Sequence, residues 1–255
     1  MGQKLGQHFL QNKEAIEKIV GLVEPRRGEL IVEIGPGEGA LTIPLAVVCK
    51  NSEARLIAIE KDRRLAGKID FAEVIVGDAI KDLAEIVENY QLPATGYKLV
   101  GNIPYYITGK LLRTIEGLRP RPVKTILMVQ KEVAERVSAI APKMNLLSSA
   151  VQVWAEAEII FTLGAKDFLP PPKVDSAVIV LTPKKNIPAN LKNYYALIKR
   201  IFASPRKTLV NNLLANSALR REEVEKVLEK AGIEVGARGQ NLSLDQILAL
   251  EKLLY

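Results

Sequence analysis

The tetrapeptide Asn102-Ile103-Pro104-Tyr105 holds the residue types best suited to a chemical reaction. It follows an apolar run at residues 97–101 that is typical of a buried strand. An amide oxygen there can accept a hydrogen bond from an amino group on a planar ring, and an aromatic face can stack on that ring, worth about 1–3 kcal/mol per base. The proline has no N–H and keeps the chain extended. These features suit alkylation of a ring-conjugated amine, although an ordinary Asn-Pro turn would have the same letters.

A glycine-rich loop follows an earlier apolar run. Leu30–Ile34 is predicted to be a buried strand, and it leads into Gly35-Pro36-Gly37-Glu38-Gly39. Alternating glycines permit a tight turn and a close approach of ligand to backbone. The spacing differs from the G-x-G-x-x-G of dinucleotide-binding loops, and Glu33 and Glu38 would repel a phosphate. The loop therefore favours a ligand with a cationic amino-acid portion.

Two further apolar runs end close to an acidic residue. Glu60 ends the run at 56–60 and lies 21 residues beyond Gly39, about the spacing of a carboxylate that binds ribose hydroxyls. Asp78 follows the run at 74–77 and could accept a hydrogen bond from an adenine amine. Each acid alone could instead cap a helix or lie in solvent. Together with the loop and Asn102, the two acids predict a pocket for a nucleoside with a charged tail, and S-adenosylmethionine fits that description.

Short motifs that are weak singly occur in a specific order along nearly the whole chain. They are Gly6–Leu10, Glu33–Thr42, Glu60, Gly77-Asp78, Asn102–Tyr105, Phe168–Ser176, Arg206–Leu209 and Asn211–Leu213. This ordered set resembles the KsgA family of ribosomal RNA adenine dimethyltransferases. The resemblance implies an enzyme that uses S-adenosylmethionine to dimethylate two adjacent adenosines. The target implied is the 3′-terminal hairpin of 16S rRNA, modified during biogenesis of the small ribosomal subunit.

The resemblance also assigns roles to individual residues. By their positions in the family pattern, the cofactor contacts would be His8, Leu10, Gly35, Gly37, Glu60, Asp78, Ala79 and Asn102. The target base would be held by Asn102, Pro104 and Tyr105. These assignments agree with the chemistry expected from the residues themselves.

Further assignments concern the other face of the base and the RNA. Phe168 would close over the base, and Arg206 and Lys207 would contact the RNA. Without the resemblance, Phe168 could equally be a loop aromatic anchored in the core. His8, the single histidine of the chain, could equally be a structural residue.

The chain departs from the family pattern at three places. Tyr106 stands where the family often has asparagine after the tetrapeptide. Met144-Asn145-Leu146-Leu147-Ser148 replaces a Tyr-Gly-x-Leu-Ser segment, and Ser204-Pro205-Arg206-Lys207 replaces a stretch with two arginines before the lysine. These departures concern contacts with RNA more than methyl transfer.

The order of predicted elements indicates an α/β fold. From residue 30 to residue 130, strands alternate with helical stretches, as in a Rossmann-like, doubly wound and mostly parallel sheet. Strands predicted at 157–163 and 176–181 would add an antiparallel edge. Beyond a boundary near 184–188, four helices are predicted at 194–203, 209–215, 221–231 and 244–254. We therefore expect a catalytic domain at 1–185 that binds S-adenosylmethionine, and a helical, basic, RNA-binding domain at 186–255.

Positive charge is concentrated near the end of the chain. Of the formal net charge of +7, residues 184–255 contribute +6, with 13 Lys and Arg against 7 Asp and Glu. This asymmetry favours a nucleic-acid partner, although basic solvated surfaces are common.

Other features of the composition exclude several classes of protein. The single cysteine, Cys49, excludes an internal disulfide, and the absence of a Cys/His cluster argues against a metal site. No signal peptide and no run approaching about 20 apolar residues is present, so a cytoplasmic protein without a membrane span is expected. A monomer is the simplest expectation.

Three other functions remain open from the sequence. An Erm-type 23S rRNA dimethyltransferase would share the core motifs, but the long basic C-terminal part favours the small subunit. A largely non-catalytic assembly factor would bind the small-subunit precursor, with methylation incidental. A DNA adenine methyltransferase is less expected, because such enzymes usually carry a separate DNA-reading module.

Overall fold

The computed structural model describes residues 8–90, 96–188, 190–215 and 217–255. Residues 6 and 7 of the first motif lie outside these ranges. The chain divides into two compact units, the first made of Met1–Ala134 and Glu156–Pro183, and the second of Glu135–Ala155 and Lys184–Tyr255. Each unit is described by itself.

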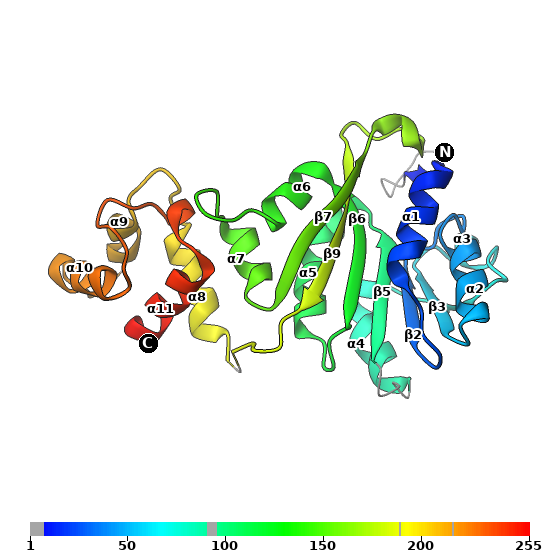
Figure 1. Ribbon diagram of the computed structural model, residues 1–255, viewed down its shortest axis with the longest axis horizontal. Helices are drawn as coiled ribbons and strands as arrows, with labels where there is room; N and C mark the ends of the chain where they lie inside the picture. The colour runs from blue at the N-terminus through cyan, green and yellow to red at the C-terminus, as the bar shows by residue number, and fades with distance from the viewer. Residues whose placement is uncertain (1–7, 91–95, 189, 216) are drawn as a thin grey trace. The chain divides into compact units, whose positions relative to one another are not determined.

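The first unit contains a seven-stranded sheet with the order β4-β3-β2-β5-β6-β9-β7 (Figure 1). The strands are β2 (Leu30–Ile34), β3 (Arg55–Glu60), β4 (Glu73–Val76), β5 (Tyr97–Asn102), β6 (Lys124–Gln130), β7 (Ala155–Leu163) and β9 (Ser176–Pro183). The pairs β2–β3, β2–β5, β3–β4 and β5–β6 are parallel, and β9 runs antiparallel to β6. The predicted Rossmann-like sheet with an antiparallel strand is thus confirmed. Strand order reverses between β2 and β5, the position where such sheets bind ligands.

Helices cover both faces of this sheet. They are α1 (Lys13–Val23), α2 (Thr42–Asn51), α3 (Arg63–Ala66), α4 (Ala79–Asn89) and α5 (Thr108–Gly117). Helix α1 packs against α2 and β6, and α4 packs against α5. In Figure 1, α1 lies in front of the sheet and α4 behind it. Double coverage explains why all five residues of β2 are buried and why its sequence shows no polar alternation.

A second, two-stranded sheet was not predicted. Strand β1 (Phe9–Leu10) pairs antiparallel with β8 (Phe168–Leu169), and Leu10 lies opposite Phe168. The pairing places the start of the described chain beside the segment that follows β7. Strands this short carry no periodicity, so only tertiary contacts reveal them.

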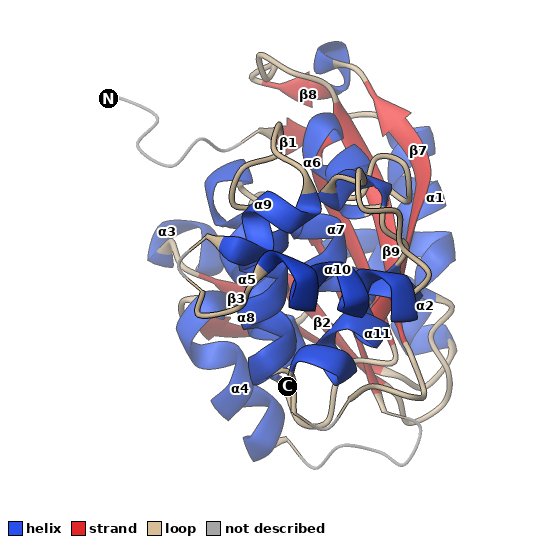
Figure 2. Cartoon of the chain, turned by 90° about the vertical axis from the view of Figure 1, so that its left-hand side faces the viewer, coloured by secondary structure: helices blue, strands red, loops and turns tan. Residues whose placement is uncertain are grey.

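The second unit is built of helices (Figure 2). They are the end of α6 (Lys131–Val137), α7 (Leu146–Gln152), α8 (Lys192–Ile201), α9 (Leu209–Leu214), α10 (Arg221–Lys230) and α11 (Leu244–Leu254). The four helices predicted beyond the boundary are confirmed. The cap predicted for the last one is present, because Ser243 Oγ accepts from Gln246 N at 3.2 Å and Gln246 Oε1 accepts from Ser243 N at 3.0 Å. Within the described residues, every helix is too short or too polar to cross a bilayer.

Glu135–Ala155 groups with the C-terminal helices, whereas the sequence analysis placed it in the first domain. Its polar contacts explain the difference. Tyr194 Oη donates to Ser149 O at 2.9 Å, and Met144 N donates to Gln240 O at 3.1 Å. A boundary drawn at one point along the chain cannot show such contacts between distant segments.

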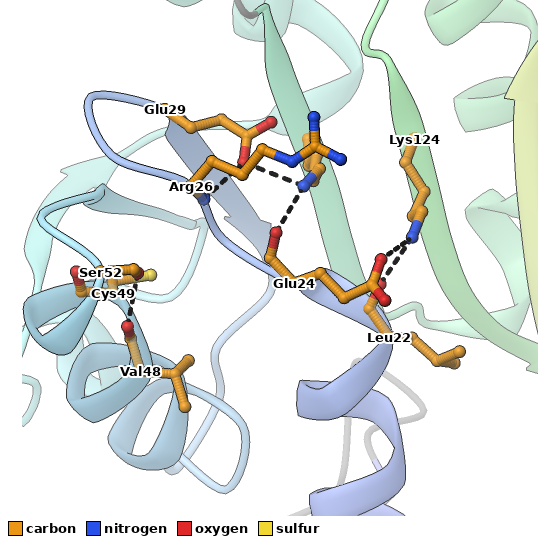
Figure 3. Close-up of polar contacts among 9 residues, drawn as sticks. Leu22, Glu24, Arg26, Glu29, Val48, Cys49, Ser52 and Lys124 are labelled. Carbon is orange, nitrogen blue, oxygen red and sulfur yellow. Dashed lines mark hydrogen bonds and ion pairs between the residues drawn. The ribbon is translucent and has the colours of Figure 1, made fainter.

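Two lysines on neighbouring strands hold the end of α1 at the amino ends of the strands (Figure 3). Lys98 and Lys124 are register partners in β5 and β6. Lys98 Nζ donates to Glu24 O at 2.8 Å and to Glu29 Oε2 at 2.9 Å. Lys124 Nζ donates to Leu22 O at 3.0 Å and pairs with Glu24 Oε2 at 2.9 Å. Positive charge at these carbonyls stabilises the helix end.

The buried pair of this cluster allows a test of stability. The side chains of Lys98 and Glu29 are 7% and 2% exposed, so Lys98→Met would leave an uncompensated buried carboxylate. We expect the free energy of unfolding to fall by about 3–5 kcal/mol, and Glu29→Met added to Lys98→Met to restore most of the loss. Urea denaturation measures both effects.

The control for this test is an exposed ion pair of the same type. Lys18 pairs with Glu14, and their side chains are 57% and 75% exposed. Lys18→Met should change the free energy of unfolding by no more than about 1 kcal/mol. Equal losses in the Lys98→Met single variant and in the double variant would contradict the charge-burial explanation.

Candidate active site

A pocket of about 280 Å³ opens at the carboxyl ends of the central parallel strands. Its wall includes the last residue of β2, the last of β3 and the last of β5, which are Ile34, Glu60 and Asn102. Ten residues predicted for the site line it: His8, Leu10, Gly35, Gly37, Glu60, Asp78, Ala79, Asn102, Pro104 and Tyr105. Parallel strands bring these segments together because their carboxyl ends meet at one edge of the sheet.

The structure places the other predicted site residues elsewhere. Phe168 is 4% exposed and belongs to the hydrophobic core with Leu10 and Val100. Phe168 is thus anchored in the core, which was one of the two possibilities considered from the sequence. Its role of covering the target base stays a prediction. Arg206 and Lys207 are exposed between α8 and α9 in the second unit. Their contact with RNA also stays a prediction.

The glycine loop requires glycine for two separate reasons. Gly37 has a φ of +58°, in the left-handed region that other residues rarely adopt. A Cβ on Gly37 would also lie 3.0 Å from the Phe9 ring. Gly35 N donates to Ile59 O at 2.9 Å, which fixes the loop to the end of β3. The loop is therefore a firm wall of the pocket.

Glu60 is oriented by two backbone N–H groups. Its Oε2 accepts from Gly37 N at 3.1 Å, and its Oε1 accepts from Asp62 N at 2.8 Å. A carboxylate has about four acceptor positions, so the remaining lone pairs of Glu60 can accept hydroxyl donors. This geometry suits a carboxylate that binds two neighbouring hydroxyl groups.

Asp78 caps a helix and also lines the pocket. Its Oδ1 accepts from Ile80 N at 3.0 Å at the start of α4, and its Oδ2 pairs with Lys61 Nζ at 2.8 Å. The hydrogen bond from Lys61, reinforced by that of Ile80 N–H, lowers the pKa of Asp78. Asp78 can therefore cap α4 and line the pocket at the same time. An amine donor that reached Oδ2 would compete with the Lys61 ammonium.

The sequence analysis treated Glu33 as negative charge near the glycine loop and did not count it among the cofactor contacts. It lines the pocket, it is 1% exposed, and its Oε2 has no hydrogen-bond partner among the described residues. Burial raises the pKa of Glu33 to about 8, against an interaction with the Thr42 hydroxyl that lowers it, and the charge of Glu60 adds a smaller rise. An unpaired buried carboxyl oxygen marks a place for a cationic or N–H group of a ligand. The signal in the sequence was an acid inside the apolar run of Leu30–Ile34.

The amide of Asn102 is oriented by the N-terminal segment. Its Nδ2 donates to His8 O at 2.9 Å, so its Oδ1 keeps its acceptor capacity. The strand end itself is tightly packed, because a Cβ on Gly101 would lie 2.5 Å from Ile34 O. Asn102 is thus presented in one orientation at the carboxyl edge of the sheet.

Tyr105 is held from two sides. Its ring stacks on the His8 ring with centroids 5.8 Å apart and planes inclined by 29°, and its hydroxyl lies 2.7 Å from Ser176 Oγ. His8 Nδ1 in turn lies 2.8 Å from Pro170 O. Burial raises the pKa of Tyr105, which keeps its hydroxyl neutral. The pairing of β9 with β6 brings Ser176 to this tyrosine, and the pairing of β1 with β8 holds the segment after His8; the sequence analysis did not foresee these contacts.

The sequence model of the family described as "Ribosomal RNA adenine dimethylase" matches residues 2–255. This chain belongs to that family. It is 36% identical over 268 residues to the ribosomal RNA small subunit methyltransferase A of Thermosynechococcus vestitus, covering 99% of this chain and 96% of the relative. It is 38% identical over 270 residues to the Nostoc punctiforme protein of the same name, covering 96% and 91%.

Solved structures agree with the family. A dimethyladenosine transferase from Plasmodium falciparum has a TM-score of 0.75 and 26% identity, covering 95% of this chain and 96% of the other. The 23S rRNA methyltransferase ErmE has a TM-score of 0.73 and 26% identity, covering 96% and 99%. The chain is therefore a ribosomal RNA adenine dimethyltransferase that uses S-adenosylmethionine.

The pocket meets the chemical requirements of this cofactor. Glu60 and Asp78 offer carboxylate acceptors to hydroxyl and amine donors. Glu33 lines the same pocket as Gly35 and Gly37, and a carboxyl group there suits an ammonium group. The donor set thus fits a nucleoside joined to an amino acid.

The raised pKa of Glu33 predicts a pH-dependent stability. The folded protein holds this proton up to about pH 8, whereas an unfolded glutamate loses it near its ordinary value of 4.5. The stabilisation is therefore complete below the ordinary value and is lost as the pH rises through about 8. Glu33→Gln, which does not titrate, should flatten the decline in the free energy of unfolding between about pH 5 and 9. Urea denaturation across this range measures the difference.

An exposed glutamate provides the control for that measurement. Glu14 lies on the surface in its pair with Lys18. Glu14→Gln should leave the slope between about pH 5 and 9 as in the wild type. Parallel curves for Glu33→Gln and the wild type would contradict a buried protonated carboxyl at position 33.

Proposed function

We propose that this enzyme dimethylates the exocyclic amine of adenosines in small-subunit ribosomal RNA. The observation that carries the reaction is Asn102, held at the end of β5 by His8 with its Oδ1 available to an amine. The choice of subunit is supported by relatives named small subunit methyltransferase A that match nearly the full chain. Structural likeness does not decide between subunits, because the 23S rRNA enzyme and the dimethyladenosine transferase are about equally similar.

The finer features expected from the resemblance are part of this proposal. The substrate would be a small-subunit precursor, and the targets two adjacent adenosines of the 3′-terminal hairpin of 16S rRNA. The enzyme would act as a monomer in the cytoplasm, without a metal ion. Methyl transfer from an activated donor to an amine needs positioning rather than a metal-bound nucleophile, which supports the absence of a metal ion.

We assign the cofactor to the acidic side of the pocket. Glu60 would bind the ribose hydroxyls, and Asp78, beside Ala79, the adenine amine. Gly35, Gly37 and Glu33 would receive the amino-acid portion, because a tight glycine loop lies beside a buried carboxyl group in this part of the wall. His8 and Leu10 would border the site from β1 and the residue before it. When bound there, S-adenosylmethionine supplies the methyl group.

The target base would lie against Tyr105. The tyrosine ring is already held by His8 and Ser176, so stacking on it costs little further ordering. Asn102 Oδ1 and the carbonyl of Pro104 would accept the two N–H bonds of the amine. These two acceptors favour a tetrahedral nitrogen, whose lone pair is no longer delocalised into the ring and can attack the methyl group. Such positioning can lower a barrier by up to about 7–11 kcal/mol.

We expect Asn102→Ala to lower turnover about 10²- to 10³-fold, the range seen when one positioned polar group is removed from an active site. RNA affinity should hardly change, because phosphate contacts supply most of it. Single-turnover methyl transfer and filter binding measure the two effects. Asn89→Ala, at the exposed end of α4, is the control and should match the wild type. Unchanged turnover in Asn102→Ala would remove this residue from the mechanism.

We assign RNA contacts to the second unit, whose segment at 184–255 carries most of the net positive charge. Arg206 and Lys207 are both exposed there. Replacing both with alanine should weaken RNA binding and reduce the slope of log K against log salt by about 0.7–0.9 per lost phosphate contact. Replacing the exposed Lys13 and Lys18 of α1 removes the same charge from the first unit and should leave the slope unchanged. Equal slopes in wild type and the Arg206/Lys207 variant would place the RNA surface elsewhere.

The function is tested by tritiated methyl transfer onto purified small subunits, naked 16S rRNA and naked 23S rRNA. We expect label in dimethyladenosine of the small subunit or its rRNA. Label confined to 23S rRNA would support the Erm-type alternative. A strain that carries Asn102→Ala separates the enzyme from an assembly factor, because subunit profiles like those of the wild type would show that binding alone suffices.

A further inference from the structure

Tyr106 lines the pocket but is 62% exposed. It belongs to the 3₁₀ helix η1 (Tyr105–Ile107), directly after Tyr105. The two neighbouring rings differ in their surroundings, because Tyr105 is held by His8 and Ser176 whereas most of Tyr106 faces solvent. The chain thus presents a second aromatic face at the mouth of the pocket.

Basic side chains line the same pocket as this exposed ring. Lys61, Lys81 and Lys110 line the same pocket, and all three are exposed. Lys61 is paired with Asp78. An aromatic face among exposed ammonium groups is the combination that binds single-stranded nucleic acid, with lysines near the phosphates and a ring against a base.

When a base enters the pocket, the base next to it loses a stacking partner that an aromatic side chain could replace. An adenosine must leave its stack to reach Asn102, and this exposes one side of the adjacent base. An unstacked base is commonly covered by an aromatic side chain. Tyr106 lies one residue from the ring assigned to the target base, so it is placed to cover the next base along the strand.

We propose that Tyr106 is a specificity-determining residue that stacks on the nucleotide next to the target adenosine. This inference rests on the proposed function, in which the target has an adjacent adenosine. Tyr106 would hold one adenosine at the mouth while the other occupies the pocket. The asparagine often found at this position in the resembling family has no aromatic face and could not make this contact.

The first test compares variants at position 106 in steady-state methylation of 16S rRNA. Tyr106→Ala and Tyr106→Asn are expected to raise the KM for RNA about 5- to 100-fold, the range of one lost stacking contact. The KM for S-adenosylmethionine and kcat should stay near the wild-type values, because Tyr106 is assigned to the neighbouring base and not to the cofactor or the target amine. Tyr106→Phe keeps the ring and should rescue the KM for RNA. An unchanged KM in Tyr106→Ala, or a loss in Tyr106→Phe as large as in Tyr106→Ala, would overturn the proposal.

The second test removes the partner base. With the wild-type enzyme, an abasic site next to the target should raise the KM for RNA. The increase should equal that caused by Tyr106→Ala with intact RNA. The variant and the abasic site together should cost no more than either alone, because they remove one contact. If the increases in KM from the variant and from the abasic site multiplied when combined, Tyr106 would act on something other than this base.

The outcomes also separate this inference from the proposed function. If the wild type methylates 16S rRNA and Tyr106→Ala leaves the KM for RNA unchanged, only the stacking role of Tyr106 is overturned. Absence of methyl transfer from the wild type to any small-subunit substrate would overturn the proposed function and this inference with it.

Discussion

The site depends on one hydrogen bond, from Asn102 Nδ2 to the carbonyl of His8 at 2.9 Å. An asparagine amide can turn by 180° and exchange its donor for its acceptor. The His8 carbonyl accepts only, so it selects the orientation in which Asn102 Oδ1 is left to accept from a substrate. A side chain that must accept a hydrogen bond from an amine needs this orientation before the substrate arrives.

The rest of the first unit keeps His8 in place. The residues after it pair with β8, and His8 Nδ1 lies 2.8 Å from Pro170 O. Helix α1 follows directly, with its cap residue Asn12 bonded to Asp167 at 2.8 Å. At the other end of α1, Lys98 and Lys124 hold its last carbonyls. The helix thus ties the amino ends of the strands to the segment that orients Asn102.

Acidic groups in the pocket are distinguished by their surroundings. Glu60 is engaged by two backbone N–H groups, Asp78 is paired with Lys61, and Glu33 is buried with an unpaired oxygen. Burial raises the pKa of Glu33, whereas the Lys61 ammonium lowers that of Asp78. Three carboxyl groups in one pocket can therefore take up different parts of a ligand that carries hydroxyl, amine and ammonium groups.

The sequence by itself determined the features that depend on neighbouring residues. Leu30–Ile34 was predicted with the observed bounds, because a continuous apolar run identifies a doubly covered strand. The Ser243 cap followed from Gln246 three residues later. The motif order also predicted which segments would meet, since the carboxyl ends of parallel strands share an edge.

Only the tertiary structure decided the features that join distant segments. The burial of Phe168 and the support of Tyr105 by His8 and Ser176 depend on the pairing of β1 with β8 and of β9 with β6. Two more features depend on contacts between distant segments. They are the placement of Glu135–Ala155 with the C-terminal helices and the unpaired oxygen of Glu33. Periodicity reports which face of an element is buried, but not which remote residue covers it, because that choice is made by packing across the whole chain.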